Sequence, residues 1–347
     1  MHIFLDESGT FAFPPKGEFS PSVLGALIVP DCTIDRLFQK YERVRNRLPK
    51  ENGEVKGRQL NEEQVNEVVT WVRRNQCVYE PIVIEMGRES QADIAERQLQ
   101  MAAALTENLT DGHHTTLKAQ LNKLSAQLEA MAQPLFVQAA LTFELLARII
   151  HEHPAYWMQR QPKEILNFHW MMDGKAIQGV TPAEEWWDIT KAGFLQSKLA
   201  RKPMMAIEGY DLTAFDKKFE MRMPQYLKDT LFPDRETGFD LKLLLEEHFT
   251  FSAAPEYGLE LVDIVTNATR RALKGNLGKR GWHQIPELMI SRHGQCLSLT
   301  SLSKAADASN LPYRDVISTG FGLGGRYMVT AKLASSLDLP DHIFETA

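Results

Sequence analysis

The segments HIFLDESGT at residues 2–10 and SVLGALIV at residues 22–29 set the architecture that we expect for this chain. Residues 2–5 read as a short strand that ends at Asp6, and Ser8 with Gly9 supply turn residues after it. Residues 22–29 read as a second strand ended by Pro30, and the residues between the two strands suit a loose hairpin. These two segments therefore predict antiparallel pairing at the start of the sheet.

The rest of the chain alternates between strands and helices. A helix is expected at 33–48, capped by Thr33 or Asp35, and another from its cap Asn61 to about 75. Pro81 favours an edge position or a bulge for a third strand at 77–84. The later expected elements are a strand at 165–172, a helix at 182–199, a short apolar piece at 204–207, a mixed and mainly helical segment at 213–230, a strand at 241–251 whose start could be helical, a helix at 258–273 and a helix near 283–291. Strand–helix–strand units give parallel pairs, so the sequence predicts an α/β fold with a mixed sheet.

Residues 91–160 are rich in Ala, Leu, Gln and Glu, with apolar residues spaced as in helices. We expect two or three helices here, broken near Gly112 and Pro134, as a helical insertion packed on the sheet. The predicted core is therefore discontinuous, at residues 1–90 and 161–275, and residues 276–347 form a C-terminal extension. An apolar face on the insertion would suit a homodimer or a partner protein, and equally packing on its own sheet.

Composition places the chain among ordinary globular proteins. It has 347 residues, of which 44% are hydrophobic and 24% are charged. The net charge of −6 gives no overall attraction to nucleic acid, although local basic clusters can still bind phosphate. The three cysteines, Cys32, Cys77 and Cys296, are scattered, which argues against a zinc framework and for a reducing compartment. We see no signal peptide and no long apolar run, so we expect a cytoplasmic protein with no membrane contact.

Three aspartates carry the candidate chemistry. Asp6 and Asp173 each follow an apolar strand, where an aspartate before Ser-Gly or Gly is more often a turn residue. Asp263 lies among apolar residues of a helix, where a carboxylate needs either a cation partner or a metal ion. Functional sites gather at the carboxyl ends of strands in α/β sheets. Carboxylates forced together there repel one another, and a divalent ion such as Mg²⁺ would relieve that repulsion.

Four segments resemble the signature blocks of a bacterial and phage family, domain of unknown function 3800, in the RNase H-like superfamily. They are FLDESGT at 4–10, EVKG at 54–57, MMDGK at 171–175 and GLELVDIVTNATRRA at 258–272, in the family's order. The resemblance covers residues 1 to about 275, without the insertion, and its last block is the most specific. It implies an RNase H-like fold and a nuclease that holds Mg²⁺ or Mn²⁺.

The resemblance also implies roles for matching positions. Asp6, Asp173 and Asp263 would be the catalytic metal ligands, and Lys56 could contact a phosphate, although a solvated loop lysine is the alternative. Glu7 belongs to the first motif and would be a further metal ligand, although strand alternation points it to the face opposite Asp6 unless the chain bends there. The sequence departs from the family at 260, where glutamine is usual; Glu260 could add a fourth carboxylate or pair with a nearby cation.

Other polar features are less specific. A basic run after Asp263 could hold a nucleic-acid backbone, or could be a solvated helix end that complements the helix dipole. Its members are Arg270, Arg271, Lys274, Lys279 and Arg280. Alternation places His169 on the face of Asp173, where a core or surface role is favoured over a catalytic one. We expect His151 and His153 at the surface. GFGLGGR at 320–326 lacks a P-loop ending and reads as a loop.

These patterns favour a metal-dependent nuclease acting on DNA or RNA. The alternatives are a non-catalytic RNase H-like module that binds nucleic acid or a protein, and a metal hydrolase acting on a small phosphoester. Members of the resembled family occur in mobile elements and antiviral loci, so the resemblance implies a role in defence.

Overall fold

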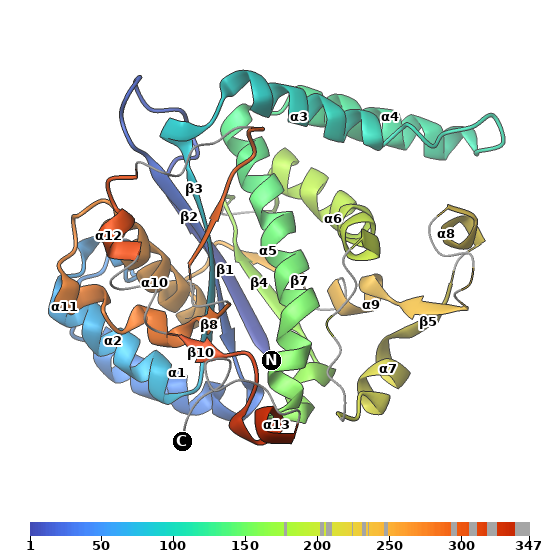
Figure 1. The fold of residues 1–347 in the computed structure, drawn as a ribbon. Helices are drawn as coiled ribbons and strands as arrows, with labels where there is room; N and C mark the ends of the chain where they lie inside the picture. The colour runs from blue at the N-terminus through green and yellow to red at the C-terminus, as the bar shows by residue number, and fades with distance from the viewer. Residues whose placement is uncertain are drawn as a thin grey trace.

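A computed structural model describes residues 1–176, 179–201, 205, 210–223, 225–230, 234, 236–245, 249–292, 297–304, 311–317 and 325–336. Within these residues a six-stranded sheet has the order β7-β4-β1-β2-β3-β9 (Figure 1). Its strands are β1 (His2–Ser8), β2 (Pro21–Val29), β3 (Val78–Glu85), β4 (His169–Asp173), β7 (Phe249–Ser252) and β9 (Ser298–Thr300). The β1–β2 and β2–β3 pairs are antiparallel, whereas β1–β4, β4–β7 and β3–β9 are parallel. The predicted α/β class and mixed sheet are confirmed.

One face of the sheet is covered by α1 (Asp31–Arg45), α2 (Glu62–Arg74) and α10 (Tyr257–Leu273) (Figure 1). Helix α10 lies directly on β1 and β2 because two glycines let the backbones approach. A Cβ on Gly25 would lie 2.2 Å from the hydroxyl of Thr266, and a Cβ on Gly258 would lie 2.1 Å from the ring of Phe4. Any larger side chain at these positions would push α10 away from the sheet, and with it the residues that α10 carries.

The opposite face is covered by the insertion, whose helices are α3 (Gln91–Ala104), α4 (Thr115–Glu129) and α5 (Gln133–Met158). The predicted breaks near Gly112 and Pro134 are confirmed, with Pro134 in the first turn of α5. Helix α5 packs on β2 and β3, while α3 and α4 reach beyond the end of the sheet (Figure 1). By length and composition α5 could cross a membrane, but 56% of its most apolar window is buried inside the protein.

The helix starts show which capping predictions hold. The Asn61 side chain accepts a hydrogen bond from the Gln64 backbone amide, and the Asn61 backbone amide donates one to Gln64 Oε1, which confirms Asn61 as the cap of α2. Helix α1 begins earlier than predicted, directly after Pro30, and the Glu164 carboxylate caps it by accepting hydrogen bonds from the amides of Asp31 at 2.7 Å and Cys32 at 3.2 Å. Thr33 therefore lies inside the helix, where its hydroxyl donates to the carbonyls of Pro30 and Asn75.

The segment between β4 and β7 is more broken than the sequence indicates. It contains α6 (Pro182–Arg201), α7 (Thr213–Phe219), β5 (Glu220–Arg222), α8 (Gln225–Thr230), β6 (Thr237–Phe239) and α9 (Leu241–Leu245). The predicted strand at 165–172 begins only at His169, after a 3₁₀ turn at Pro162–Leu166. The predicted strand at 241–251 is helical at its start, and β7 begins at Phe249. The apolar piece at 204–207 lies outside the described residues except for residue 205.

The C-terminal segment completes the core sheet instead of lying apart from it. Its elements are α11 (Lys279–Trp282), β8 (Ile290–Ser291), β9, α12 (Arg314–Val316), β10 (Arg326–Tyr327) and α13 (Ala331–Ser336). The predicted helix near 283–291 is wrong, since a 3₁₀ turn and β8 stand there. Strand β9 pairs with Ile82–Ile84 of β3, so β3 is not an edge strand, and Pro81 lies just outside that pairing. Most of GFGLGGR lies outside the described residues.

Candidate functional site

Three elements bring Asp6, Asp173 and Asp263 to one end of the β1–β4 pair. The parallel register pairs Leu5 with Met172, and so places Asp6 beside Asp173, the last residue of β4. Asp263 comes from α10, which packs against β1. Asp6 lies inside β1 rather than after it, because the strand continues to Ser8. The three carboxylates therefore come from distant parts of the chain to neighbouring positions.

The two innermost carboxylates have raised pKa values. Asp6 is only 8% exposed, and burial, followed by the charges of Glu7, Asp263 and Asp173, raises its pKa well above its usual value. Burial also raises the pKa of Asp263 to about 6, although the Gly57 amide and the charge of Lys56 act in the opposite direction. Both shifts mean that ionising this cluster at neutral pH costs free energy, which a bound cation would recover.

The EVKG segment positions Asp263. The Gly57 amide donates a 2.7 Å hydrogen bond to Asp263 Oδ2. Glycine is needed here because a Cβ would lie 2.8 Å from the Cα of Ile264 in α10. The neighbouring Lys56 lies beside the cluster, but its ammonium forms a 2.7 Å ion pair with Glu54. Lys56 is one-third exposed and is therefore partly available to a ligand.

Lys175 belongs to the site, although the sequence analysis did not select it as a site residue. Its Nζ lies 2.5 Å from Glu7 Oε1 and 2.9 Å from Asp173 Oδ2, and these two carboxylates raise its pKa against the opposing effect of burial. Strand alternation holds as expected, since Phe4 packs on the α10 side and Leu5 on the α5 side, which is the side of Glu7. Lys175 thus pairs with Glu7 on the α5 side of the sheet and with Asp173 on the α10 side.

The donor set fits a hard divalent ion. All the candidate ligands are carboxylate oxygens, which Mg²⁺ and Mn²⁺ prefer. Glu7 Oε2 is buried and has no hydrogen-bond partner among the described residues. The aspartates do not form a set whose donor atoms all lie within 4.8 Å of one another. Mg²⁺ usually keeps several waters, so carboxylates at this spacing can bind it partly through water.

Glu260 is not a further ligand, and its assignment as one is wrong. Its side chain is fully buried and both oxygens are occupied. Arg45 binds them at 2.6 and 2.7 Å, the Tyr41 hydroxyl donates at 2.8 Å, and the Val55 amide donates at 3.0 Å. The alternative interpretation, a pair with a nearby cation, is confirmed. Glu260 instead ties α10 to α1 one helical turn before Asp263.

The paired arginines of α10 bind backbone carbonyls of the protein itself. Arg270 donates to the carbonyl of Pro21 at 2.9 Å, and Arg271 donates to the carbonyl of Leu60 at 2.7 Å. Burial lowers the pKa of both guanidinium groups. These contacts fix α10 to β2 and to the loop before α2, so both arginines have structural roles that the sequence could not distinguish from phosphate binding.

The remainder of the basic run is more accessible. Lys274 and Lys279 are exposed, and Arg280 forms a 2.9 Å ion pair with the exposed Glu63. Exposed ion pairs of this kind are weak and can be exchanged for a ligand contact. Within the basic run, Lys274, Lys279 and Arg280 are therefore the residues that can contact the phosphates of a nucleic acid.

The histidines considered in the sequence analysis lie away from the three candidate metal ligands. His169 pairs in register with His2 at the start of β4, at the opposite end from Asp173. His153 is fully buried, with Nε2 3.3 Å from Glu80 Oε2, so its placement at the surface is wrong. His151 is also mostly buried, at 12% exposed. Pro154 does not end α5, which continues to Met158, and both histidines therefore face protein.

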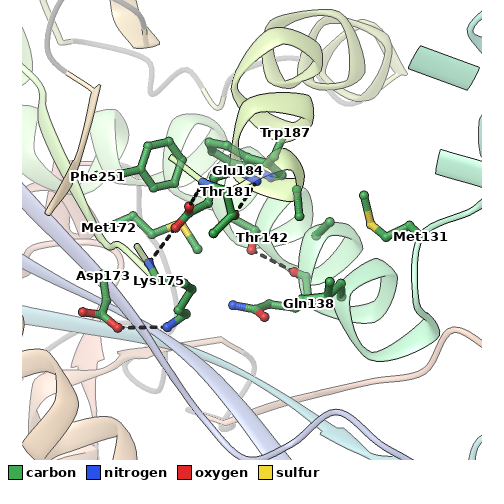
Figure 2. A pocket seen from close by; sticks show the side chains of 13 residues that line it. Met131, Gln138, Thr142, Met172, Asp173, Lys175, Thr181, Glu184, Trp187 and Phe251 are labelled. Carbon is green, nitrogen blue, oxygen red and sulfur yellow. Dashed lines mark hydrogen bonds and ion pairs between the residues drawn. The ribbon is translucent and has the colours of Figure 1, made fainter. Parts of the chain in front are cut away.

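An apolar cleft opens beside Asp173 and Lys175 (Figure 2). Its volume is about 490 Å³ when the space open to solvent at its mouth is included, and its walls come from α5, α6, β4 and β7. The apolar lining residues are Met131, Leu135, Ala139, Met172, Ala183, Trp187 and Phe251. Gln138 points from α5 toward the Asp173–Lys175 pair (Figure 2). The cleft therefore combines aromatic and aliphatic walls with a polar end next to the carboxylates.

Comparisons with protein-family models, with characterised proteins and with solved structures found no match for this chain.

Proposed function

We propose that this chain is a divalent-metal-dependent nuclease with an RNase H-like fold, which hydrolyses phosphodiester bonds of DNA or RNA. The observation that supports this most is the placement of the buried Asp6 and the half-buried Asp263 beside Asp173, with both carboxylates held at raised pKa. A protein that kept this arrangement for stability alone would do better with neutral residues, because the ionised cluster is destabilising. Strongly shifted carboxylates in one cluster are typical of functional sites.

Asp6, Asp173 and Asp263 would hold the ion. Bound Mg²⁺ or Mn²⁺ would lower the pKa of an attacking water and offset charge on the phosphate. The Gly57 amide keeps Asp263 in place, and Lys56 stands close enough to the cluster to contact a phosphate oxygen. No protein nucleophile is needed for this reaction class.

The cleft beside Asp173 supports a nucleotide-containing substrate. Nucleobases are flat and largely apolar on their faces, and they stack on aromatic side chains. Trp187 and Phe251 supply aromatic surface in the cleft wall, and Gln138 supplies an amide that can pair with a base edge (Figure 2). A base in the cleft would place its phosphate toward Asp173 and Lys175.

Lys175 favours the alternative function, a module that binds nucleic acid or a protein without cutting it. Its ammonium already pairs with Glu7 and Asp173, so the cluster has a cation of its own. A module that binds nucleic acid or a protein without cutting it would need no more than that. Activity of the variants decides between the two functions.

The test is cleavage of labelled single- and double-stranded DNA, RNA and free nucleotides by the purified protein, with Mn²⁺, with Mg²⁺ and with EDTA. We expect metal-dependent cleavage of a polymer, and a loss of at least about 100-fold in Asp263→Asn, since changes that only support a ligand already cost 10–100-fold. Asp111→Asn, in the exposed loop after α3, is the matched control and should cleave normally. No cleavage by the wild-type chain, or equal cleavage by Asp263→Asn, would leave the non-catalytic module as the better proposal.

A further inference from the structure

A second group of potential metal ligands lies at the opposite end of the β1–β4 pair. His2, Asp31 and His169 each offer one donor atom, and these atoms all lie within 4.8 Å of one another. The parallel register places His2 beside His169, and Asp31 is the first residue of α1. Among the residues that the structure describes, no other three side chains of ligand type meet this spacing.

The geometry of the three side chains is close to that of a bound site. His2 Nε2 lies 3.4 Å from Asp31 Oδ1. Donor atoms about 2.0–2.1 Å from a tetrahedral ion stand about 3.4 Å from each other. The rings of His2 and His169 are stacked with centroids 4.7 Å apart and an angle of 21° between them, so the two imidazoles lie face against face. Small side-chain rotations would bring the donors onto one ion.

The chemistry of this group differs from that of the acidic cluster. Two imidazole nitrogens and one carboxylate oxygen suit Zn²⁺ and its late first-row neighbours, whereas Mg²⁺ prefers oxygen alone. The side chains of His2 and Asp31 are 31% and 38% exposed, so an ion can reach them from solvent. Asp31 Oδ1 also pairs with the Met1 ammonium at 2.8 Å, so an ion bound by this oxygen shares it with that positive charge.

We propose that His2, Asp31 and His169 form a binding site for a late first-row transition-metal ion, with Zn²⁺ as the preferred occupant. The ion joins the starts of β1, α1 and β4, which are three segments far apart in the sequence, and stabilises the fold at this end of the sheet. With three protein ligands and an exposed side, the fourth position is open to water. The site does not depend on the proposed nuclease activity.

The test is thermal unfolding and calorimetry of the full chain with ZnCl₂, using a histidine-free tag at the C-terminus. Zn²⁺ at about 100 times its Kd should raise the Tm of the wild-type protein by about 4 °C. His169→Gln and, separately, Asp31→Asn should weaken Zn²⁺ binding by at least about 10-fold. His283→Gln, which removes an exposed histidine elsewhere, and Cys32→Ser, which removes the thiol next to Asp31, should both bind Zn²⁺ as the wild type does.

A further variant separates this site from the acidic cluster. Zn²⁺ should still raise the Tm of Asp173→Asn, whereas Mg²⁺ should no longer do so. For His169→Gln, Mg²⁺ should still raise the Tm, whereas Zn²⁺ should no longer do so. The proposal is overturned if wild-type protein does not bind Zn²⁺. It is also overturned if both His169→Gln and Asp31→Asn bind Zn²⁺ as tightly as wild type, or if Cys32→Ser abolishes binding. Calorimetry reports the affinity directly, so a variant with a lower Tm is still informative.

Discussion

Replacing Asp263 with asparagine should stabilise the metal-free protein at pH 8 and abolish its stabilisation by Mg²⁺. Burial, and after it the charges of Glu54 and Asp173, raise the pKa of Asp263 from 3.8 to about 6. The ionised carboxylate is therefore less favourable in the folded chain than in the unfolded one. Asparagine carries no charge and keeps an oxygen that can accept the 2.7 Å hydrogen bond from Gly57.

The size of the effect follows from the shift. A rise of about two pKa units corresponds to a penalty of at most about 3 kcal/mol in the free energy of unfolding. The penalty is absent below pH 3.8, grows as the pH rises, and is complete above about pH 6. About half of it is present at pH 5. For a chain of 347 residues, 3 kcal/mol corresponds to a change of about 4 °C in Tm.

The assay is thermal unfolding of wild type, Asp263→Asn and the control Asp111→Asn in EDTA at pH 8 and pH 5, followed by titration with MgCl₂. Asp263→Asn should melt above wild type at pH 8, with a smaller difference at pH 5, and Mg²⁺ should raise the Tm of wild type and of Asp111→Asn only. A variant that melts at or below the wild-type temperature at pH 8, and still responds to Mg²⁺, would refute the argument that Asp263 stands in a repulsive, cation-binding cluster.

Three further predictions concern the residues around the site and the buried ion pairs. Glu260→Gln leaves Arg45 without its buried partner charge and should lower the free energy of unfolding by about 3 kcal/mol in urea titrations, the opposite sign from Asp263→Asn. Gly57→Ala should displace the loop from α10 and weaken Mg²⁺ binding, measured by calorimetry, about 10-fold or more. The control is Gly53→Ala, whose Cβ would meet no atom. It should change stability, because Gly53 has a positive φ, and leave the Mg²⁺ affinity unchanged. Arg292, His153 and Arg148 lower the pKa of Glu80 from 4.5 to about 2 against the opposing effect of burial. The ionised Glu80 therefore stabilises the fold fully above pH 4.5. This contribution of about 3 kcal/mol is lost as the pH falls toward 2. Glu80→Gln should therefore flatten the acid side of the stability profile measured by urea unfolding, and an unchanged profile would contradict this.

The parts of the fold that could be predicted are those set by local pattern. Strand β2 is an unbroken apolar run, and Asn61 carries its own partner three residues later, so both follow from neighbours in the sequence. The segment at 241–251 was harder, because Leu-rich residues suit a buried helix as well as a strand. Local pattern likewise could not show that β9 belongs to the core sheet, since its three residues pair with a strand more than 200 positions earlier.

The candidate site divides in the same way. Asp6, Asp173 and Asp263 could be proposed because each follows or interrupts an apolar pattern. The ion pair of Glu260 could not be predicted, because its partner Arg45 is 215 residues away in the sequence. Lys175 carried one usable signal, its place two residues after Asp173, but only the end of β1 shows that it also reaches Glu7.

The short pairing between β9 and β3 has a consequence for synthesis on the ribosome. Strand β3 is buried along its whole length, and among the described residues its Ile82–Ile84 edge is paired by residues 298–300 alone. Until residues 298–300 emerge, a nascent chain would present an apolar strand with free backbone donors and acceptors, which is the kind of edge that recruits other chains. Nascent copies of this protein thus depend on late-made residues for protection against aggregation, and shortening the gene before codon 298 should send the product to inclusion bodies.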